Sequence, residues 1–171
     1  MKKIFFLLAL AFSILSCDQA VEKSENQVGH VEMNDSKSAA MDAFNDAYLA
    51  NDYTGQNEIF ADSAIAYANG VQVSPAEMMQ SFLDGRTFYN DVKNLDRGTV
   101  TMHYDDGRIY TNTWFRWEGV SKSTGKLVDS PVHGYFLWKD DKVAEVGFIF
   151  DSYDYVTNMG VAEETDATSE E

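Results

Sequence analysis

The second half of this chain consists of four long segments in which apolar and polar residues alternate, each separated from the next by a tight turn. The segments cover residues 93–104, 108–121, 126–139 and 142–151. The turns between them contain Asp-Asp-Gly, Ser-Thr-Gly and Asp-Asp, and such residues favour sharp reversals of the chain. Because connections this short join antiparallel neighbours, the pattern predicts a meander of four long antiparallel strands.

Two helices are predicted ahead of this meander. In the first, over residues 38–51, apolar side chains recur at helical spacing. The second begins after Ser74, a capping serine followed by proline at the first helical position and glutamate at the third, and it runs to about Tyr89. A short helix at 55–60 and a strand at 64–68 lie between them. We therefore expect an α+β fold, with the helices packed on one face of a curved, mainly antiparallel sheet.

Composition excludes several classes of function. The 171 residues, 44% of them hydrophobic, suffice for one core. Thirteen Lys and Arg against 28 Asp and Glu give a net charge of −15, which argues against nucleic acid as a partner, because that affinity rests on clustered cations. The single cysteine excludes an internal disulfide and a Cys-rich zinc site. Since no His, Asp or Glu residues stand at ligand spacing and no glycine-rich phosphate loop is present, we expect neither a metal site nor a cofactor.

The N-terminus carries a targeting signal. Lys2 and Lys3 precede an apolar run over residues 4–15, which is too short to cross a bilayer core of about 30 Å, because that needs roughly 20 residues. The run leads into Ile-Leu-Ser-Cys, which resembles the signal of bacterial lipoproteins. This resemblance implies removal of residues 1–16, a diacylglycerol on Cys17 and a place in the bacterial cell envelope, periplasmic or surface-exposed. An ordinary signal peptide or anchor with an incidental cysteine is the alternative.

Polar segments flank the predicted domain on both sides. Residues 17–37 contain no Phe, Trp or Tyr and no apolar period, so they predict a flexible tether after the lipidated cysteine. His30 lies in this tether and is expected to be solvated rather than a ligand. Residues 161–171 are acidic, with no basic residue, and predict a disordered tail. The folded domain is therefore expected over residues 38–160.

The order of these elements, together with short stretches of local sequence, resembles the nuclear transport factor 2-like (SnoaL-like) superfamily. The resemblance covers residues 40–155 and implies a cone-shaped barrel, in which a curved sheet wraps around the N-terminal helices. The pocket that this cone encloses serves catalysis in some members and binding alone in others. The matching stretches are residues 47–52 at the end of the first helix, 59–64 at the step into the first strand, 73–79 at the start of the later helix, 136–143 around the last turn, and 150–151.

One enzymatic branch of the superfamily is disfavoured by the residues present. The steroid-isomerase branch uses a tyrosine on the first helix, a carboxylate base after the first strand and a carboxylic acid on the third long strand. Here Phe44 and Tyr67 occupy the first two matching positions, and His133 or Gly134 occupies the third. Because neither of the last two places holds a carboxylate, the proton abstraction of that branch has no base.

The remaining candidates for acid–base chemistry are His133 and Asp151, which the meander places on adjacent strands, with Tyr104 as a further hydroxyl. The cyclase branch of the superfamily is similar in using a histidine and an aspartate within the cone. Strand alternation argues against this pair, because Val132 and Phe136 share the apolar face opposite His133. Two interpretations stay open: His133 acts in the pocket, or it lies on the outer sheet face, where relatives often dimerise.

Aromatic side chains dominate the expected ligand pocket. Trp114, Phe115 and Trp117 place rings on both faces of one strand, so one face is expected in the core and the other under a second copy of the chain. This predicts a homodimer through the sheet face, with a ligand platform as the alternative. The residues assigned to the pocket are Tyr48, Phe82, Trp114, Phe136, Trp138 and Asp151.

The missing isomerase carboxylates and the absence of cofactor motifs favour a lipid-anchored, non-catalytic module that binds a small apolar ligand or an interaction partner. Whether the chain is an enzyme stays open at this point. The alternative is a SnoaL-like isomerase, cyclase or dehydratase, in which His133, Asp151 and a pocket tyrosine act on a small hydrophobic substrate.

Overall fold

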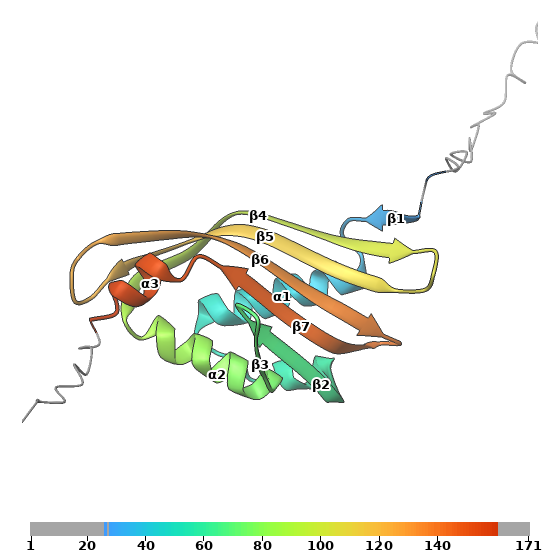
Figure 1. The fold of residues 1–171 in the computed structure, drawn as a ribbon, viewed down its shortest axis with the longest axis horizontal. Coiled ribbons are helices and arrows are strands. Elements are labelled where there is room, and N and C mark those ends of the chain that lie inside the picture. Colours follow the sequence, from blue (N-terminus) through green and yellow to red (C-terminus); the bar gives the residue numbers. More distant parts are fainter. Residues whose placement is uncertain (1–25, 27, 161–171) are drawn as a thin grey trace, which may run out of the picture.

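The computed structural model describes Asn26 and residues 28–160. The predicted signal peptide, the lipidation site at Cys17 and the acidic tail lie outside these residues. No helix in the described part of the chain is long and apolar enough to span a membrane. The elements in chain order (Figure 1) are β1 (Gly29–Glu32), α1 (Ser36–Ala50), the 3₁₀ helix η1 (Gln56–Ile59), β2 (Phe60–Ala68), β3 (Val71–Val73), α2 (Pro75–Arg86), β4 (Tyr89–Tyr104), β5 (Ile109–Ser121), β6 (Leu127–Lys139), β7 (Lys142–Phe150) and α3 (Tyr153–Thr157).

The strands form one curved sheet with the order β1-β4-β5-β6-β7-β2-β3. All neighbours are antiparallel except β2 and β7, which run parallel. The predicted meander is therefore confirmed as β4 to β7, with α1 and α2 on one side of it (Figure 1). The expected α+β class, with a mainly antiparallel sheet curved over helices, is also confirmed.

Two irregularities in β4 bend this sheet. The register of β4 against β5 shifts around Asp91 and again around Asp96. Both residues have left-handed backbones, with φ of 52° and 54°, a conformation that aspartate tolerates better than most residues. An extra residue in one strand of a pair bends that strand and increases its twist. The long strands thereby form a concave face large enough to hold helices.

Capping side chains mark the starts of α1 and α2. Ser74 and Glu77 form the predicted capping box of α2, with Pro75 in the first turn. Asp35, rather than a serine, caps α1: its Oδ1 accepts hydrogen bonds from the Ser38 backbone and from the Thr101 hydroxyl, both at 2.8 Å. This cap anchors the start of α1 to β4, because Thr101 belongs to that strand.

The structure corrects the expected tether in its last part. Residues 29–32 form β1, which pairs with β4 in antiparallel register, so His30 lies opposite His103 instead of in a flexible linker. The prediction of a tether relied on the lack of a hydrophobic period. A polar strand at an open sheet edge can form without such a period, because backbone hydrogen bonds to the neighbouring strand stabilise it. Two other short elements, β3 and α3, were also not expected from the sequence.

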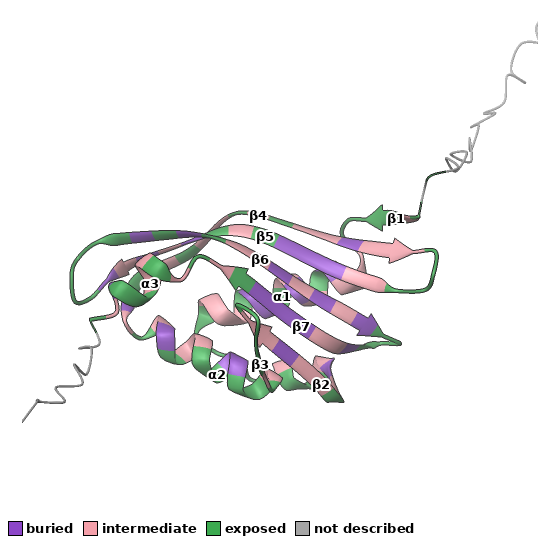
Figure 2. Cartoon of the chain, viewed as in Figure 1, coloured by how far each residue is buried: buried purple, intermediate pink, exposed green. Residues whose placement is uncertain are grey.

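The core lies between the concave face and the helices. Phe44 of α1 is 1% exposed and packs edge-to-face on Phe136, with ring centroids 5.4 Å apart. Gly134 on β6 leaves room for the ring of its β7 partner Phe148, because a β-carbon at this glycine would lie 2.5 Å from that ring. In Figure 2 the buried residues follow the strands above the helices, whereas the far side of α2 is largely exposed.

Candidate functional site

A cavity of about 70 Å³ opens between the three helices and the concave faces of β5, β6 and β7. Its walls are mostly aromatic rings, with a valine on β6. Besides the tryptophan, five neutral polar side chains line the cavity: an asparagine and a tyrosine on α1, a serine on β6, a tyrosine after α1 and a tyrosine on α3. The lining residues are Asn45, Tyr48, Tyr53, Phe82, Phe115, Trp117, Ser130, Val132, Phe148, Phe150 and Tyr155.

Tyr48 is a lining residue whose hydroxyl keeps free hydrogen-bonding capacity. Its hydroxyl accepts a hydrogen bond of 2.8 Å from the indole Nε1 of Trp117. No described residue accepts the Tyr48 hydroxyl proton, so that proton remains available to a molecule in the cavity. Burial raises the pKa of Tyr48, although the Trp117 hydrogen bond and the nearby Arg86 oppose the shift. Tyr48 is therefore a neutral hydrogen-bond donor at physiological pH.

Arg86 holds Tyr48 in place from outside the cavity. Its guanidinium lies 5.5 Å from the centre of the Tyr48 ring, and its Nη1 donates to the Tyr48 carbonyl at 3.1 Å. The two contacts join the end of α2 to α1. Tyr48 is thus oriented by Trp117 at its hydroxyl and by Arg86 at its ring and backbone.

Two of the other polar lining groups form hydrogen bonds within the protein. The Asn45 amide donates to the Met41 carbonyl at 3.1 Å, and the Ser130 hydroxyl donates to the Asp151 carbonyl at 2.8 Å. Burial raises the pKa of Tyr53 and of Tyr155, so both phenols are neutral. Among the described residues that line the cavity, none is a carboxylate or an imidazole.

Of the six residues assigned to the pocket, the structure places Tyr48 and Phe82 in the cavity lining. Phe136 and Trp138 instead fill the core, where the Trp138 indole donates to the Thr111 hydroxyl at 2.9 Å. Trp114 lies on the opposite, convex face and is 43% exposed. These three assignments are corrected. Trp114 and its neighbour Phe115 point to opposite faces of β5, whereas Phe136 and Trp138 point inward from β6 but are packed in the core.

The candidate acid–base group is corrected as well. His133 lies on the convex face, stacked on Trp114 with ring centroids 5.2 Å apart, and its Nε2 is 3.0 Å from the Asn112 Oδ1. Asp151 is exposed beyond the end of β7, where its Oδ1 accepts from the Tyr153 backbone at 3.0 Å. Tyr104 packs edge-to-face against Tyr110 at the far end of β4. None of the three lines the cavity.

Some lining residues were missed although the sequence contains a signal for them. The alternation that identified Phe136 as inward also places Ser130 and Val132 on that face, and their partners on β5 are Trp117 and Phe115. Tyr155 gives no such signal, because α3 is only five residues long. It reaches the cavity by packing against Tyr89 at 5.1 Å, a contact that depends on the fold.

The structure also brings together a group of potential metal ligands outside the cavity, which the sequence spacing did not predict. The ligand atoms of His30, Glu32 and His103 lie within 4.8 Å of one another. Sequence spacing gave no sign of this cluster, because strand pairing joins residues that are distant in the sequence.

The chain resembles known proteins in its structure. No protein-family model matches the chain, and no curated protein sequence matches it. IdmH from Streptomyces antibioticus, a proposed polyketide cyclase, superposes with a TM-score of 0.55 at 15% identity, covering 74% of this chain and all of that one. AclR from Streptomyces galilaeus, a proposed hydroxylase, gives 0.54 at 17% identity over 72% of this chain and 84% of that one.

A third similar structure comes from Catenulispora acidiphila. It is a protein with a ketosteroid isomerase-like fold in complex with trimethylamine, with a TM-score of 0.55 at 10% identity over 72% of this chain and 93% of that one. At these identities the matches show the fold alone, and that fold agrees with the curved sheet and its helices. The described part of this chain is therefore a domain of the nuclear transport factor 2-like (SnoaL-like) fold.

Proposed function

We propose that this chain is a lipid-anchored protein of the bacterial cell envelope whose cone binds a small, mainly apolar molecule with one hydrogen-bond-accepting oxygen. The observation that carries the proposal is the Tyr48 hydroxyl in the lining of a mostly aromatic cavity, because it accepts a hydrogen bond from Trp117 and keeps its own proton to donate. A carbonyl or phenolic oxygen would accept this proton, while the rest of the molecule packs against the rings.

The lining also limits the size and charge of such a ligand. One enclosed water needs roughly 10–15 Å³ on the same scale, so a cavity of about 70 Å³ suits a molecule of a single ring unless side chains move. Burying an ion without a paired charge is costly. Because the described lining residues are all neutral, the proposal specifies an uncharged ligand.

A second candidate is a reaction on the same kind of molecule. It is favoured by the proposed cyclase and hydroxylase functions of IdmH and AclR, whose folds this domain shares. Tyr48 would then stabilise negative charge as it develops on the substrate oxygen. We favour binding over turnover, because no carboxylate or imidazole among the described residues stands in the lining to move a proton from carbon.

A ligand pair that differs by one oxygen tests the binding proposal. Full-length protein is titrated with p-cresol and with toluene, for wild type, Tyr48→Phe and the matched control Tyr67→Phe, whose hydroxyl has only a long contact of 3.4 Å to Gln72. We expect wild type and the control to prefer p-cresol by about fivefold, as one hydrogen bond of ~1 kcal/mol allows. Tyr48→Phe should lose the preference.

Two other results would decide against binding as proposed. If neither compound binds, or if Tyr48→Phe keeps the preference for p-cresol, the proposed role of Tyr48 is wrong. Turnover is followed separately by mass spectrometry on cyclic ketones and phenols. Product formation that disappears in Tyr48→Phe would support the second candidate instead.

The anchoring part of the proposal rests on Cys17 and the apolar segment before it. Cells that express the chain are grown with a labelled fatty acid, and the chain is recovered and its label measured. Wild type is expected to carry the label and Cys17→Ser to lack it. An unlabelled wild type would indicate an ordinary signal peptide or anchor.

We also propose that two copies pair through the convex sheet face. Trp114 and Ile149 are both more than two-fifths exposed on this face, and exposed aromatic strands are commonly covered by a partner. Light scattering after gel filtration should show a dimer for wild type and a monomer for Trp114→Ser. A monomeric wild type would contradict the proposal.

A further inference from the structure

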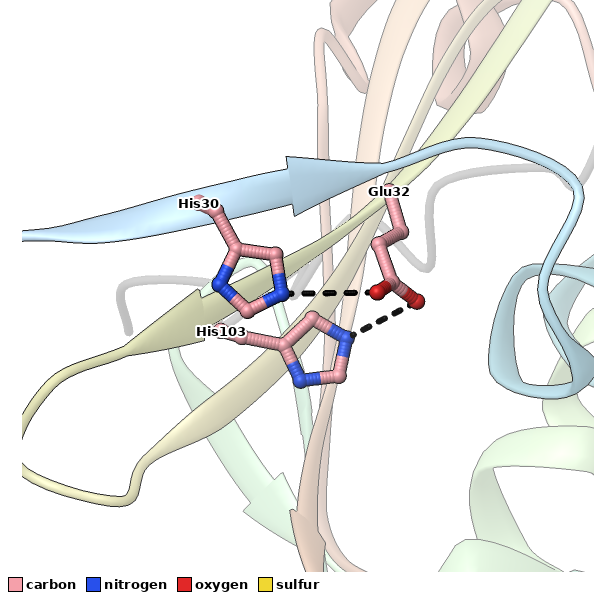
Figure 3. A group of neighbouring side chains, drawn as sticks. All are labelled: His30, Glu32 and His103. Atoms are coloured by element: carbon pink, nitrogen blue, oxygen red, sulfur yellow. Dashed lines mark ion pairs between the residues drawn. The ribbon is translucent and has the colours of Figure 1, made fainter. Parts of the chain in front are cut away.

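Three side chains converge at the edge of the sheet, where β1 pairs with β4. Figure 3 shows the rings of His30 and His103 side by side, each with a nitrogen turned toward the Glu32 carboxylate. The His30 Nε2 is 3.4 Å from Glu32 Oε1, and the His103 Nε2 is 3.6 Å from Glu32 Oε2. The two rings are nearly parallel, with centroids 4.8 Å apart.

The position of these groups follows from strand register. His30 and His103 are directly paired residues of β1 and β4, and Glu32 is two positions along β1, so it shares their face. The sheet does not require two imidazoles and a carboxylate at this place, because the backbone of β1 already pairs with the edge strand β4. The cluster is therefore independent of the cone and of the function proposed for it.

His103 supplies a second observation that points to a missing ligand. Its Nε2 is buried and has no hydrogen-bond partner among the described residues. The nearest carboxylate oxygens, on Glu32 and Asp35, are 3.6 and 4.0 Å away, beyond hydrogen-bonding distance. Buried polar atoms almost always have a partner, and an ion is one of the ordinary explanations when none is seen.

We propose that His30, Glu32 and His103 bind a divalent transition-metal ion, with Zn²⁺ as the ion that these donors fit. Bonds of about 2.0–2.2 Å in a tetrahedral site separate the ligand atoms by about 3.3–3.6 Å. The two histidine–glutamate separations of 3.4 and 3.6 Å match this spacing. Imidazole nitrogens suit zinc, copper and nickel, whereas calcium and magnesium prefer oxygen ligands throughout.

The surrounding residues complete such a site. The Asp35 Oδ2 lies 4.0 Å from the His103 Nε2, and it is available as a fourth ligand because the capping contacts use Oδ1. The His30 side chain is 58% exposed, so its ring is free to tilt until both imidazole nitrogens face one ion. A bound ion would tie β1 to β4 and so fix where the preceding segment leaves the domain.

Zinc titration of the full-length chain tests the proposal directly. Metal-free protein is titrated calorimetrically with zinc chloride, for wild type and for His30→Gln, Glu32→Gln and His103→Gln. The matched control is His133→Gln, which removes the third histidine of the chain from the convex face. We expect one ion per chain in wild type and control, and affinity at least ~10-fold weaker in each of the other three variants.

Cobalt(II) separates coordination at this site from coordination by the single cysteine of the chain. Visible d–d bands without thiolate charge-transfer absorption would support coordination by His and Glu. A thiolate band, or unchanged zinc affinity in both histidine variants, would overturn the proposal, as would the lack of binding at one equivalent. His30→Gln keeps the test valid if His103→Gln does not fold, because the His30 side chain is largely exposed.

Discussion

The indole of Trp117 on β5 donates a hydrogen bond of 2.8 Å to the hydroxyl of Tyr48 on α1, across 69 positions of sequence. The contact joins the sheet to the first helix at the cavity wall. It also determines what Tyr48 offers to a ligand, since the hydroxyl receives one hydrogen bond and keeps its own proton to donate. The position of this donor is therefore a property of the packed structure.

A mutant cycle on this pair should reveal energetic coupling. We expect Tyr48→Phe to lower the free energy of unfolding by about 1–3 kcal/mol, because the buried Trp117 N–H loses its acceptor. The Tyr48→Phe/Trp117→Phe double variant should lose less than the sum of the two single variants. Urea unfolding measures all of them, with Tyr67→Phe as the control expected within about 0.5 kcal/mol of wild type. Additive losses would mean that the hydrogen bond contributes nothing of its own.

His133 should make the stability of the domain depend on pH. Burial lowers the pKa of His133 from its ordinary value of 6.5. Above that value the imidazole is neutral in both the folded and the unfolded state. As the pH falls below 6.5, His133 takes up a proton more readily in the unfolded chain than in the folded chain, so the folded state loses stability.

The comparison that isolates this effect is wild type against His133→Gln, unfolded in urea at several pH values between about 8 and 5. Wild type should lose stability relative to the variant as the pH falls, because only wild type carries the partly buried imidazole. Parallel curves over the whole range would show that the environment of His133 does not affect its protonation.

Two strand glycines should respond in opposite ways to alanine. A β-carbon at Gly134 would lie 2.5 Å from the Phe148 ring at the cavity wall, whereas at Gly98 no atom lies within 4 Å. Gly134→Ala should cost about 1–3 kcal/mol through overpacking. Gly98→Ala should be neutral or slightly stabilising, because alanine loses less backbone entropy than glycine. Equal effects in thermal unfolding would contradict this account of the close approach.

Asp35 should prove to be the cap of α1. Asp35→Ala removes the acceptor for the Ser38 backbone and for the Thr101 hydroxyl, and we expect a loss of about 1 kcal/mol or more. Asp35→Asn keeps an oxygen in the capping position and should recover most of this loss. Both are measured by urea unfolding with a chelator present, since Asp35 adjoins the proposed metal site. Equal stability of the two variants would show that the side-chain oxygen is not what stabilises the helix start.

The sequence by itself determined the meander β4–β7, the start of α2 at Ser74 and the inward face of β6. Each of these depends on residues close together in the chain: turn residues between strands, a capping serine beside its glutamate, and alternation along one strand. For the same reason, alternation predicted correctly that His133 and Phe136 point to opposite faces of β6. Such local patterns stay readable in one sequence, because few other parts of the fold alter them.

Only the tertiary structure decided the contents of the cavity and the pairing of His30 with His103. Tyr155 enters the wall from a helix of five residues, and Trp138, which the sequence placed in the pocket, is covered by the core. β1 has no apolar period, and it forms because β4 offers an open edge of backbone donors and acceptors. The curvature of a sheet and the partner of its edge strand depend on packing between distant segments, which no local pattern of residues encodes.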